Sequence, residues 1–441
     1  MNVLKFGGTS VGSLENMHRV KNIINTYTRK IVVLSAMSGT TNTLVEISKN
    51  LENSTFGEAK RLITQLNTQY IEVINKLYHT SKTKNEALNY LGEVTQILNN
   101  FADNEFTPKT SLNILAQGEL LSTTLFTLFL NENNIKATLL PALQFMRLDA
   151  LKEPDYFYIK QQLNQLVSRH EDTKIFITQG FITLDYNGDI SNLQRGGSDY
   201  TATIIGASLN TNEVQIWTDI DGFHNNDPRF VEDTHPISQL SFEEAAELAY
   251  FGAKILHPQT VIPVREKNIP VRLKNTMLPN ANGTLINSEI HGEGIKAIAA
   301  KDGITAIKIK SARMLLAHGF LKKVFDVFEQ YETSIDMITT SEIAVSLTID
   351  DTTFLHEICR ELEKIASIEI ETNRTIICLV GNNIVNHHET PQLFQILQDV
   401  NVRMISYGGS NNNISLLINS NDKLETLRKL NRYVFEPLEV Y

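Results

Sequence analysis

Short apolar runs alternate with longer stretches of helical character through the first half of the chain. Four runs have the length and apolar content of buried strands, at residues 2–6, 31–35, 174–178 and 213–217. Three stretches have helical spacing or composition, at residues 14–28, 43–103 and 114–130. Strands that alternate with helices predict an α/β fold in which a mostly parallel sheet is sandwiched by helices.

Each predicted strand ends at glycine or polar residues, namely Gly7-Gly8, Ser35, Gln179-Gly180 and Thr218-Asp219. Ligands of such sheets bind at the carboxyl ends of the strands. We therefore expect these four segments, which are far apart in the sequence, to line one crevice.

The pattern changes in the last third of the chain. After a hinge-like region at 275–295, residues 304–350 and 375–419 each have the order strand, helix, strand, strand. The similar segments 334–341 and 401–408 predict an internal repeat of two small βαββ modules, and chance similarity between short units is the alternative. The predicted domains are residues 1–292, a first module at 293–374 and a second module at 375–441.

Composition excludes several classes of protein. The formal net charge of -10 argues against nucleic acid as the main partner, because a phosphate backbone requires a basic surface. The longest apolar stretches, such as residues 31–36, are far shorter than the roughly 20 residues of a membrane helix, and no basic start leads into an apolar secretory signal. Two cysteines, Cys359 and Cys378, provide neither a disulfide framework nor a zinc site, which fits a reducing cytoplasm.

The first segment with recognisable chemistry is Lys5-Phe6-Gly7-Gly8-Thr9-Ser10. Consecutive glycines after a buried strand let backbone N–H groups approach an anion, and Lys5 adds a positive charge. The alternative is a plain strand-to-helix turn with a solvated lysine. The sequence has no G-x-x-x-x-G-K-[ST] loop and lacks the H-R-D and D-F-G motifs of protein kinases.

A second segment runs from Gln194 to Thr201 and contains Arg-Gly-Gly-Ser-Asp. Arg195 can bind a carboxylate through two hydrogen bonds, and the glycines allow backbone contact with a ligand. Ser198 and Asp199 are also favoured helix N-caps, so a capped helix start explains part of this segment equally well.

Three further segments have weaker patterns. The polar loop after Trp217 offers Asp219 and Arg229 to a nucleotide, or these two residues form a solvated salt bridge. Lys254 lies among apolar residues, so it needs an anionic partner, a shifted pKa or a snorkelling position at a helix end. Glu119, which we expect near the start of an apolar helix, binds a substrate ammonium or simply stabilises that helix N-terminus.

In their order along the chain, these motifs resemble the pattern of the aspartate kinase family. The matching segments are 5–10, Ser38-Gly39-Thr40-Thr41-Asn42, Gly118-Glu119, Gln179-Gly180-Phe181, 195–201, Trp217-Thr218-Asp219, Asp227-Pro228-Arg229 and Phe251-Gly252-Ala253-Lys254. The tail resembles the paired ACT domains of that family, so the resemblance covers almost the whole chain. The wider amino-acid kinase superfamily shares the opening glycines but not this full set.

The resemblance implies an enzyme that uses ATP to phosphorylate the side-chain carboxylate of L-aspartate, giving 4-phospho-L-aspartate, the first step of lysine, threonine and methionine biosynthesis. It assigns ATP to Lys5, Phe6, Gly7, Gly8, Thr218, Asp219, His224, Arg229, Lys254 and Ile255. It assigns aspartate to Thr41, Glu119, Phe181, Arg195, Ser198 and Asp199.

Lys5 and Asp199 are the implied catalytic residues. The attacking carboxylate has a reference pKa of about 3.9 and is ionised at pH 7, so no general base is needed. Lys5 and Mg²⁺, which is held through the nucleotide phosphates and not by protein ligands, would stabilise the transferring phosphoryl group. Asp199 would orient Lys5.

The resemblance also implies allosteric inhibition through the tail, with L-lysine as the first choice of effector. The implied pocket contains Met314, Ala317, His318, Gly319, Phe320, Leu321, Ile335, Asp336, Thr340, Ser341 and Glu342. Two positions depart from the lysine-inhibited pattern, because His224 stands where such relatives tend to have Tyr and Ala317 replaces a small hydroxyl residue. We expect a homodimer through the ACT modules, or a tetramer, and a tail that serves only dimerisation is the alternative.

Two other functions stay open from the residues alone. Another amino-acid kinase, acting on glutamate or a carbamate, would share the opening glycines, but the paired tail modules and the Arg195 segment argue against it. A catalytically silent amino-acid sensor would have no use for Lys5, Glu119, Arg195, Asp199 and Lys254, all of which are present. Since no homoserine dehydrogenase segment follows Tyr441, a monofunctional enzyme is expected.

Overall fold

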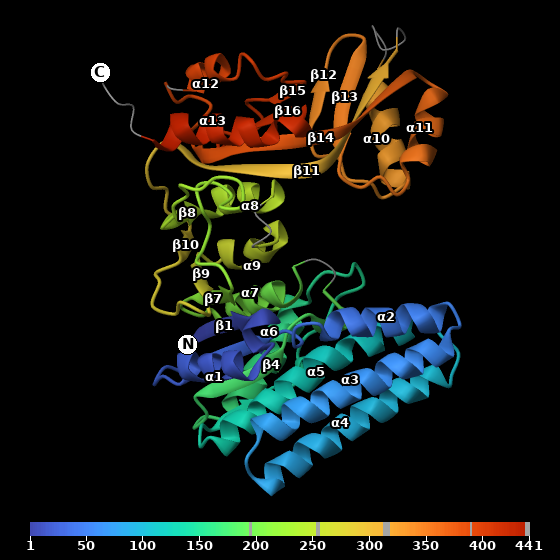
Figure 1. The fold of residues 1–441 in the computed structure, drawn as a ribbon, viewed down its shortest axis with the longest axis vertical. Helices are drawn as coiled ribbons and strands as arrows, with labels where there is room; N and C mark the ends of the chain where they lie inside the picture. The colour runs from blue at the N-terminus through green and yellow to red at the C-terminus, as the bar shows by residue number, and fades with distance from the viewer. Residues whose placement is uncertain (194–195, 253–255, 312–317, 389, 437–441) are drawn as a thin grey trace. The chain divides into compact units, whose positions relative to one another are not determined.

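The computed structural model divides the chain into two compact units (Figure 1). The first contains Met1–Phe223, Ser238–Phe242 and Leu256–Ser288, and the second contains His224–Ile237, Glu243–Ile255 and Glu289–Tyr441. The structure describes all residues except 194–195, 253–255, 312–317, 389 and 437–441. In the described part of the chain, no helix has the length and apolar character needed to cross a lipid bilayer.

The first unit is built on an eight-stranded sheet. Its order is β3 (Ala137–Leu139), β4 (Ile175–Gln179), β2 (Lys30–Leu34), β1 (Asn2–Phe6), β7 (Val214–Thr218), β9 (Val271–Asn275), β10 (Thr284–Asn287) and β8 (Gln239–Ser241). The strands from β3 to β9 are parallel, whereas β10 is antiparallel to β9. The predicted α/β class is confirmed, and the expected hinge at 275–295 contains strand β10.

Helices cover both faces of this sheet. One face buries Leu4, Phe6 and Val32 against helices α1 and α5, with further helices packed outside them. Helix α7 packs on the other face, so closely that a β-carbon added to Gly206 would lie 2.5 Å from Val214. The helices of this layer system are α1 (Leu14–Ile24), α2 (Thr40–Glu52), α3 (Phe56–Leu77), α4 (Ser81–Ala102), α5 (Pro108–Glu132), α6 (Tyr156–Ser168), α7 (Gly197–Leu209) and α9 (Ile262–Arg265). A small hairpin, β5 (Ile182–Leu184) and β6 (Ile190–Asn192), completes the unit with the 3-10 turns η1 (Thr9–Val11), η2 (Ala142–Gln144) and η3 (Pro258–Val261).

The second unit contains a six-stranded antiparallel sheet. Its order is β12 (Ile338–Thr340), β13 (Ala344–Ile349), β11 (Gly294–Lys310), β14 (Ser367–Asn382), β16 (Asn413–Asn419) and β15 (Met404–Ser406). Its helices are α10 (Phe320–Gln330), α11 (Leu355–Glu363), α12 (Thr390–Ile396) and α13 (Lys423–Phe435), the last preceded by the turn η5 (Ser420–Asp422). The strand, helix, strand, strand order occurs twice, which confirms the predicted pair of βαββ modules (Figure 1).

Two separate cores lie along the long strands β11 and β14. Ile307, Val324 and Leu347 belong to one core, whereas Ile298 and Ile377 belong to the other. The first part of β11 pairs with the last part of β14, and a register shift between Lys301 and Ile304 separates the two halves of β11. Both modules therefore share these two strands, and the module boundary at 374–375 stays a prediction.

Part of the predicted catalytic region belongs to the second unit. Phe230 and Val231 pack into the core around Ile298, and the Lys423 ammonium lies 3.8 Å from the centre of the Phe230 ring. The Asn225 carbonyl accepts a hydrogen bond of 2.8 Å from the Ile298 N–H. Helix α8 (Phe242–Tyr250) is anchored in the same unit, for example by a 2.7 Å ion pair between Glu244 and Lys296.

Candidate active site

The centre of the candidate site is an ion pair between Lys5 on β1 and Asp199 in the first turn of α7. Lys5 Nζ lies 2.6 Å from Asp199 Oδ1, and the two side chains are only 12% and 17% exposed. Gly196, which caps the start of α7, has a φ of +74° that favours glycine, and a β-carbon there would lie 2.8 Å from the Thr260 hydroxyl. The fold thus brings together the two residues predicted to be catalytic.

The glycine loop after β1 lies beside this ion pair. A β-carbon added to Gly7 would be 3.5 Å from Lys5 Nζ, and one added to Gly8 would be 2.9 Å from the Ala36 carbonyl oxygen. The Gly7 N–H donates to the Trp217 carbonyl on the neighbouring strand β7. A β-carbon at Gly8 would clash with that carbonyl, whereas one at Gly7 would make only an ordinary contact. The absence of side chains at both positions leaves the backbone of the loop open to an anion.

The end of β7 adds hydroxyl and carboxylate groups to the same edge of the sheet. The Thr218 hydroxyl donates a 3.1 Å hydrogen bond to Asp219 Oδ1, and Asn275 Nδ2 donates to the Asp219 carbonyl. Phe6, predicted to contact the nucleotide, is fully buried, with its ring stacked 5.6 Å from that of Trp217. The Phe6 side chain is therefore part of the core, and its predicted contact with the nucleotide stays a prediction.

Glu119 is a buried carboxylate in the middle of α5. Its exposed fraction is 4%, and it accepts a 3.2 Å hydrogen bond from the Ala36 N–H. Burial raises the pKa of Glu119 to about 7. The expectation that it lies near a helix start was wrong, because a Thr107 capping box and Pro108 begin the helix earlier. A helix N-terminus therefore does not account for this carboxylate.

The ends of β2 and β4 meet the start of α7 at Ser198. The Ser35 hydroxyl donates to Ser198 Oγ over 2.9 Å, and a β-carbon on Gly180 would lie 2.3 Å from Ser198 Cβ. Phe181 has a φ of +67°, which is strained for this residue type, and its N–H donates to the Thr201 hydroxyl. Ser35, which was expected to line the crevice because it follows a strand, thus contacts the predicted substrate residue Ser198.

The remaining predicted substrate and nucleotide residues belong to both units or lie outside the described residues. Thr41 is exposed in the first turn of α2, after Gly39 with its φ of +85°. His224 and Arg229 belong to the second unit, where Arg229 makes a 2.6 Å ion pair with Asp227 and His224 contacts the Thr234 hydroxyl. Arg195, Lys254 and Ile255 lie outside the residues that the structure describes.

The predicted effector residues lie in the first βαββ module. Gly319, with a φ of +83°, precedes α10, and Phe320 is buried in the core of the module. His318 and Leu321 are exposed, and Ile335 and Asp336 follow α10. Thr340 ends β12, and Ser341 and Glu342 lie between β12 and β13. Met314 and Ala317 lie outside the described residues.

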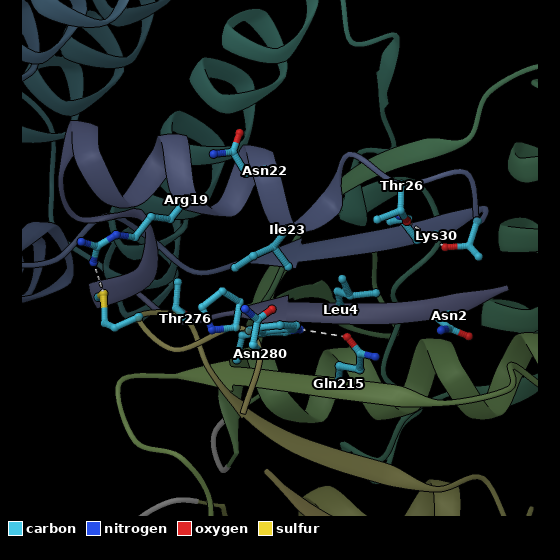
Figure 2. A pocket seen from close by; sticks show the side chains of 14 residues that line it. Asn2, Leu4, Arg19, Asn22, Ile23, Thr26, Lys30, Gln215, Thr276 and Asn280 are labelled. Atoms are coloured by element: carbon cyan, nitrogen blue, oxygen red, sulfur yellow. Dashed lines mark hydrogen bonds between the residues drawn. The ribbon is translucent and has the colours of Figure 1, made fainter. Parts of the chain in front are cut away.

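A hollow of about 570 Å³ lies elsewhere on the first unit (Figure 2). Arg19, Asn22 and Ile23 of α1 form one wall, and Leu4 and Gln215 lie on the sheet below them. None of the predicted catalytic, substrate or nucleotide residues lines this hollow, so we do not assign the candidate active site to it. At one end, Lys30 Nζ donates to the Ile24 carbonyl, and burial lowers the pKa of Lys30 to about 8.

Comparison with known proteins agrees with this geometry. The amino acid kinase family matches residues 1–275, and an ACT domain matches residues 377–433. The lysine-sensitive aspartokinase 3 of Escherichia coli (strain K12) is 32% identical over 98% of this chain and 99% of its own length. Aspartokinase 1, chloroplastic, of Arabidopsis thaliana is 36% identical over 98% of this chain and 80% of its own length.

Solved structures extend the likeness to the fold. E. coli aspartokinase III in complex with aspartate and ADP is 33% identical, with a TM-score of 0.85 over 99% of this chain and 100% of that one. The same enzyme in complex with lysine and aspartate gives a TM-score of 0.83 with the same identity and coverage. By motif order, by fold and by relatedness over nearly its full length, the chain belongs to the amino acid kinase family and, within it, to the aspartokinases.

Proposed function

We propose that this aspartokinase transfers the γ-phosphoryl group of ATP to the side-chain carboxylate of L-aspartate through the site around Lys5 and Asp199. The observation that carries the proposal is the 2.6 Å ion pair between these residues beside the Gly7-Gly8 loop. The likeness to an aspartokinase solved with aspartate and ADP supports the two substrates.

The mechanism needs positioning and charge, not proton abstraction. The substrate carboxylate is ionised at neutral pH, so it can attack directly. Lys5 would stabilise the negative charge that develops on the transferring phosphoryl group, because a preorganised cation next to that charge lowers the barrier. Asp199 would hold the Lys5 ammonium in place and is a positioning residue.

Mg²⁺ belongs to the proposal as the ion that accompanies ATP. We propose that the ion is held through the nucleotide phosphates beside the Gly7-Gly8 loop and not by protein ligands, because Mg²⁺ prefers oxygen ligands and the Asp199 carboxylate is paired with Lys5. When bound, the ion would neutralise charge on the phosphate oxygens.

Aspartate recognition would centre on Glu119. Its buried carboxylate suits the α-ammonium of an amino acid. Burial deprives the negative charge of solvation by water, and a bound cation would compensate that loss. Ser198 lies in the first turn of α7, the Phe181 N–H donates to Thr201 of the same helix, and Thr41 lies in the first turn of α2. We assign the substrate α-carboxylate to Arg195.

A hydroxylamine trap tests the proposal. The purified full chain is incubated with Mg-ATP, L-aspartate and hydroxylamine, and aspartyl-hydroxamate is measured by its iron complex. We expect hydroxamate that depends on ATP and on L-aspartate, and little with L-glutamate. Product with glutamate or another acid and none with aspartate would mean that the substrate assignment is wrong.

Regulation by L-lysine through the ACT modules is the second part of the proposal. The ACT match and the E. coli relative solved with lysine and aspartate support it. We also propose a homodimer, or a tetramer, through the edge strands of the six-stranded sheet. Ile338 on β12 and Ile405 on β15 are 37% and 39% exposed, and unpaired edges of this kind favour association. Light scattering with and without L-lysine measures the mass.

The domain boundaries and the location are also proposals. We propose a catalytic domain at residues 1–292 followed by ACT modules at 293–374 and 375–441, and limited proteolysis with mass determination tests these limits. A cytoplasmic location is supported by the two free, buried cysteines, Cys359 and Cys378. Fractionation of cells that express the chain tests it.

A further inference from the structure

Asp336 is a buried carboxylate of which one oxygen has partners, while the other accepts no hydrogen bond from the described residues. Its side chain is 1% exposed, and Oδ1 lies 2.6 Å from Lys301 Nζ and 2.8 Å from the Tyr250 hydroxyl. Oδ2 is also buried, yet it accepts no hydrogen bond from the residues that the structure describes. A carboxylate accepts about four hydrogen bonds, so Asp336 retains capacity for a further donor.

Lys301 has a second partner that does not depend on Asp336. Its ammonium lies 2.9 Å from Asp350 Oδ2 and 4.6 Å from the centre of the Tyr250 ring. Lys301 stands at the register shift of β11, where the strand passes from one module core to the other. If another cation paired with the Asp336 carboxylate, Lys301 could retain its ion pair with Asp350 without a change in the backbone of β11.

A pocket of about 300 Å³ opens beside Asp336. Its walls include a second carboxylate, Glu247, together with Tyr250 and the polar groups of Ser410 and Asn413. Glu247 Oε2 accepts a 2.6 Å hydrogen bond from Asn413 Nδ2. Among the described residues that line this pocket there is no lysine or arginine, so the pocket favours a small cation with several N–H donors, as a primary ammonium has.

We propose that Lys301 is a built-in competitor for the ammonium group of the amino-acid effector at Asp336, and that Tyr250 transmits the exchange to α8. The proposal rests on the proposed regulation by an amino acid, and it adds the internal cation that the effector must displace. Tyr250 shares Oδ1 with Lys301, so a new cation on Asp336 changes the hydrogen bond that holds the end of α8. The chain continues from α8 directly into the segment of Lys254 and Ile255, which the family resemblance assigns to ATP.

Lys301→Met in the full chain tests the competition. Methionine keeps the apolar stem and removes the charge, so Asp336 loses its internal cation and should bind an external one more tightly. We expect the dissociation constant for L-lysine, measured by calorimetry at pH 8, to fall about tenfold or more. Lys308→Met is the matched control, because Lys308 lies on the same strand and its acidic partner Glu369 is 3.9 Å away. Its affinity for L-lysine should equal that of the wild type.

The outcomes separate this proposal from the proposed function. Wild-type protein that makes aspartyl-hydroxamate but binds no L-lysine would refute both the proposed effector and the competition. Wild-type protein that binds L-lysine, with Lys301→Met unchanged or weaker in affinity, would refute the competition alone.

Tyr250→Phe gives an independent test that keeps the Lys301–Asp336 pair. We expect its turnover without L-lysine to match the wild type, while the ratio of the apparent KM for ATP with and without saturating L-lysine moves severalfold toward one. Tyr407→Phe is the control, because the Tyr407 hydroxyl also makes a hydrogen bond in this unit, to the Val385 carbonyl, but not with Asp336. If this KM ratio in Tyr250→Phe equals that of the wild type, the proposed role of the Tyr250 hydroxyl is wrong.

Discussion

Replacing Glu119 with glutamine should make the substrate-free protein more stable and a poorer enzyme. Burial raises the pKa of this carboxyl from the usual 4.5 to about 7, and each pH unit of such a rise corresponds to about 1.4 kcal/mol. The side chain is 4% exposed, so solvent screens little of this penalty. The ionised carboxylate therefore destabilises the empty protein by roughly 3 kcal/mol at pH 8.

The sign of the pH dependence follows from the raised pKa. Between pH 4.5 and 7 the folded protein holds the Glu119 proton while the unfolded chain releases it, so this residue lowers the free energy of unfolding as the pH rises through that window. Glutamine is neutral throughout and keeps an oxygen for the Ala36 N–H. The variant should therefore melt about 5 °C higher than the wild type at pH 8, with a difference that disappears near pH 4.5.

Calorimetric melting temperatures across pH, with and without L-aspartate, measure both effects. L-aspartate should raise the melting temperature of the wild type but not of Glu119→Gln, whose KM for aspartate should rise by a factor of about 100 or more as a buried ammonium loses its charge partner. No gain in stability at pH 8, or an unchanged KM, would refute the reasoning.

Glu132→Gln on the same helix is a control of opposite sign. Partial burial alone would raise the pKa of Glu132, but hydrogen bonds from Thr80 and His79 outweigh it and lower the pKa. Its ionised form therefore stabilises the fold above the usual carboxyl pKa, and that stabilisation is lost as the pH falls through the lowered pKa. The glutamine variant should be less stable than the wild type at pH 8, with aspartate KM unchanged.

Three further substitutions test other parts of the structure. Lys5→Met should lower kcat by a factor of about 100 to 1,000 without unfolding the protein, and hydroxamate formation with circular dichroism shows both. Gly180→Ala would place a β-carbon 2.3 Å from Ser198 Cβ, so we expect a loss of about 1–3 kcal/mol and a higher KM for aspartate, measured by denaturation and kinetics. Burial lowers the pKa of Lys30 from 10.5 to about 8, so its charge penalty is present below pH 8 and fades as the pH rises toward 10.5. The stability of the wild type relative to Lys30→Met should therefore rise by about 3 kcal/mol between pH 7 and 10.5, and a flat difference would contradict this account.

Continuous apolar character made the central strands predictable. Residues 31–35 were expected to form a strand, and β2 occupies Lys30–Leu34, because a strand buried on both faces requires apolar side chains at every position. The strands β3, β8 and β10 are only three or four residues long and carry polar side chains, so no periodicity could distinguish them from loops. Their place in the sheet depends on tertiary pairing.

The site was predictable where it follows strand ends and unpredictable where it depends on packing between distant segments. The family resemblance implied that Asp199 orients Lys5, and the two side chains meet because β1 and α7 both bring residues to the carboxyl edge of a parallel sheet. No pattern in the sequence predicted that residues 224–237 belong to the second unit. It results from Phe230 and Val231 packing into a core whose other members lie far along the chain.

The burial of charged side chains could not be predicted from the sequence either, and it predicts that the two units respond differently to ligands. Glu119 and Asp336 are both nearly inaccessible carboxylates with raised pKa values caused by desolvation. In the described part of the chain Glu119 has no cationic partner. A substrate ammonium would therefore reduce the free-energy cost of the buried negative charge, and this reduction would favour binding. Asp336 is already compensated by Lys301, so an effector ammonium would have to exchange with an internal cation. The catalytic unit should thus gain affinity for aspartate as the pH rises through 7, whereas affinity at Asp336 should be set by the competing lysine of the chain.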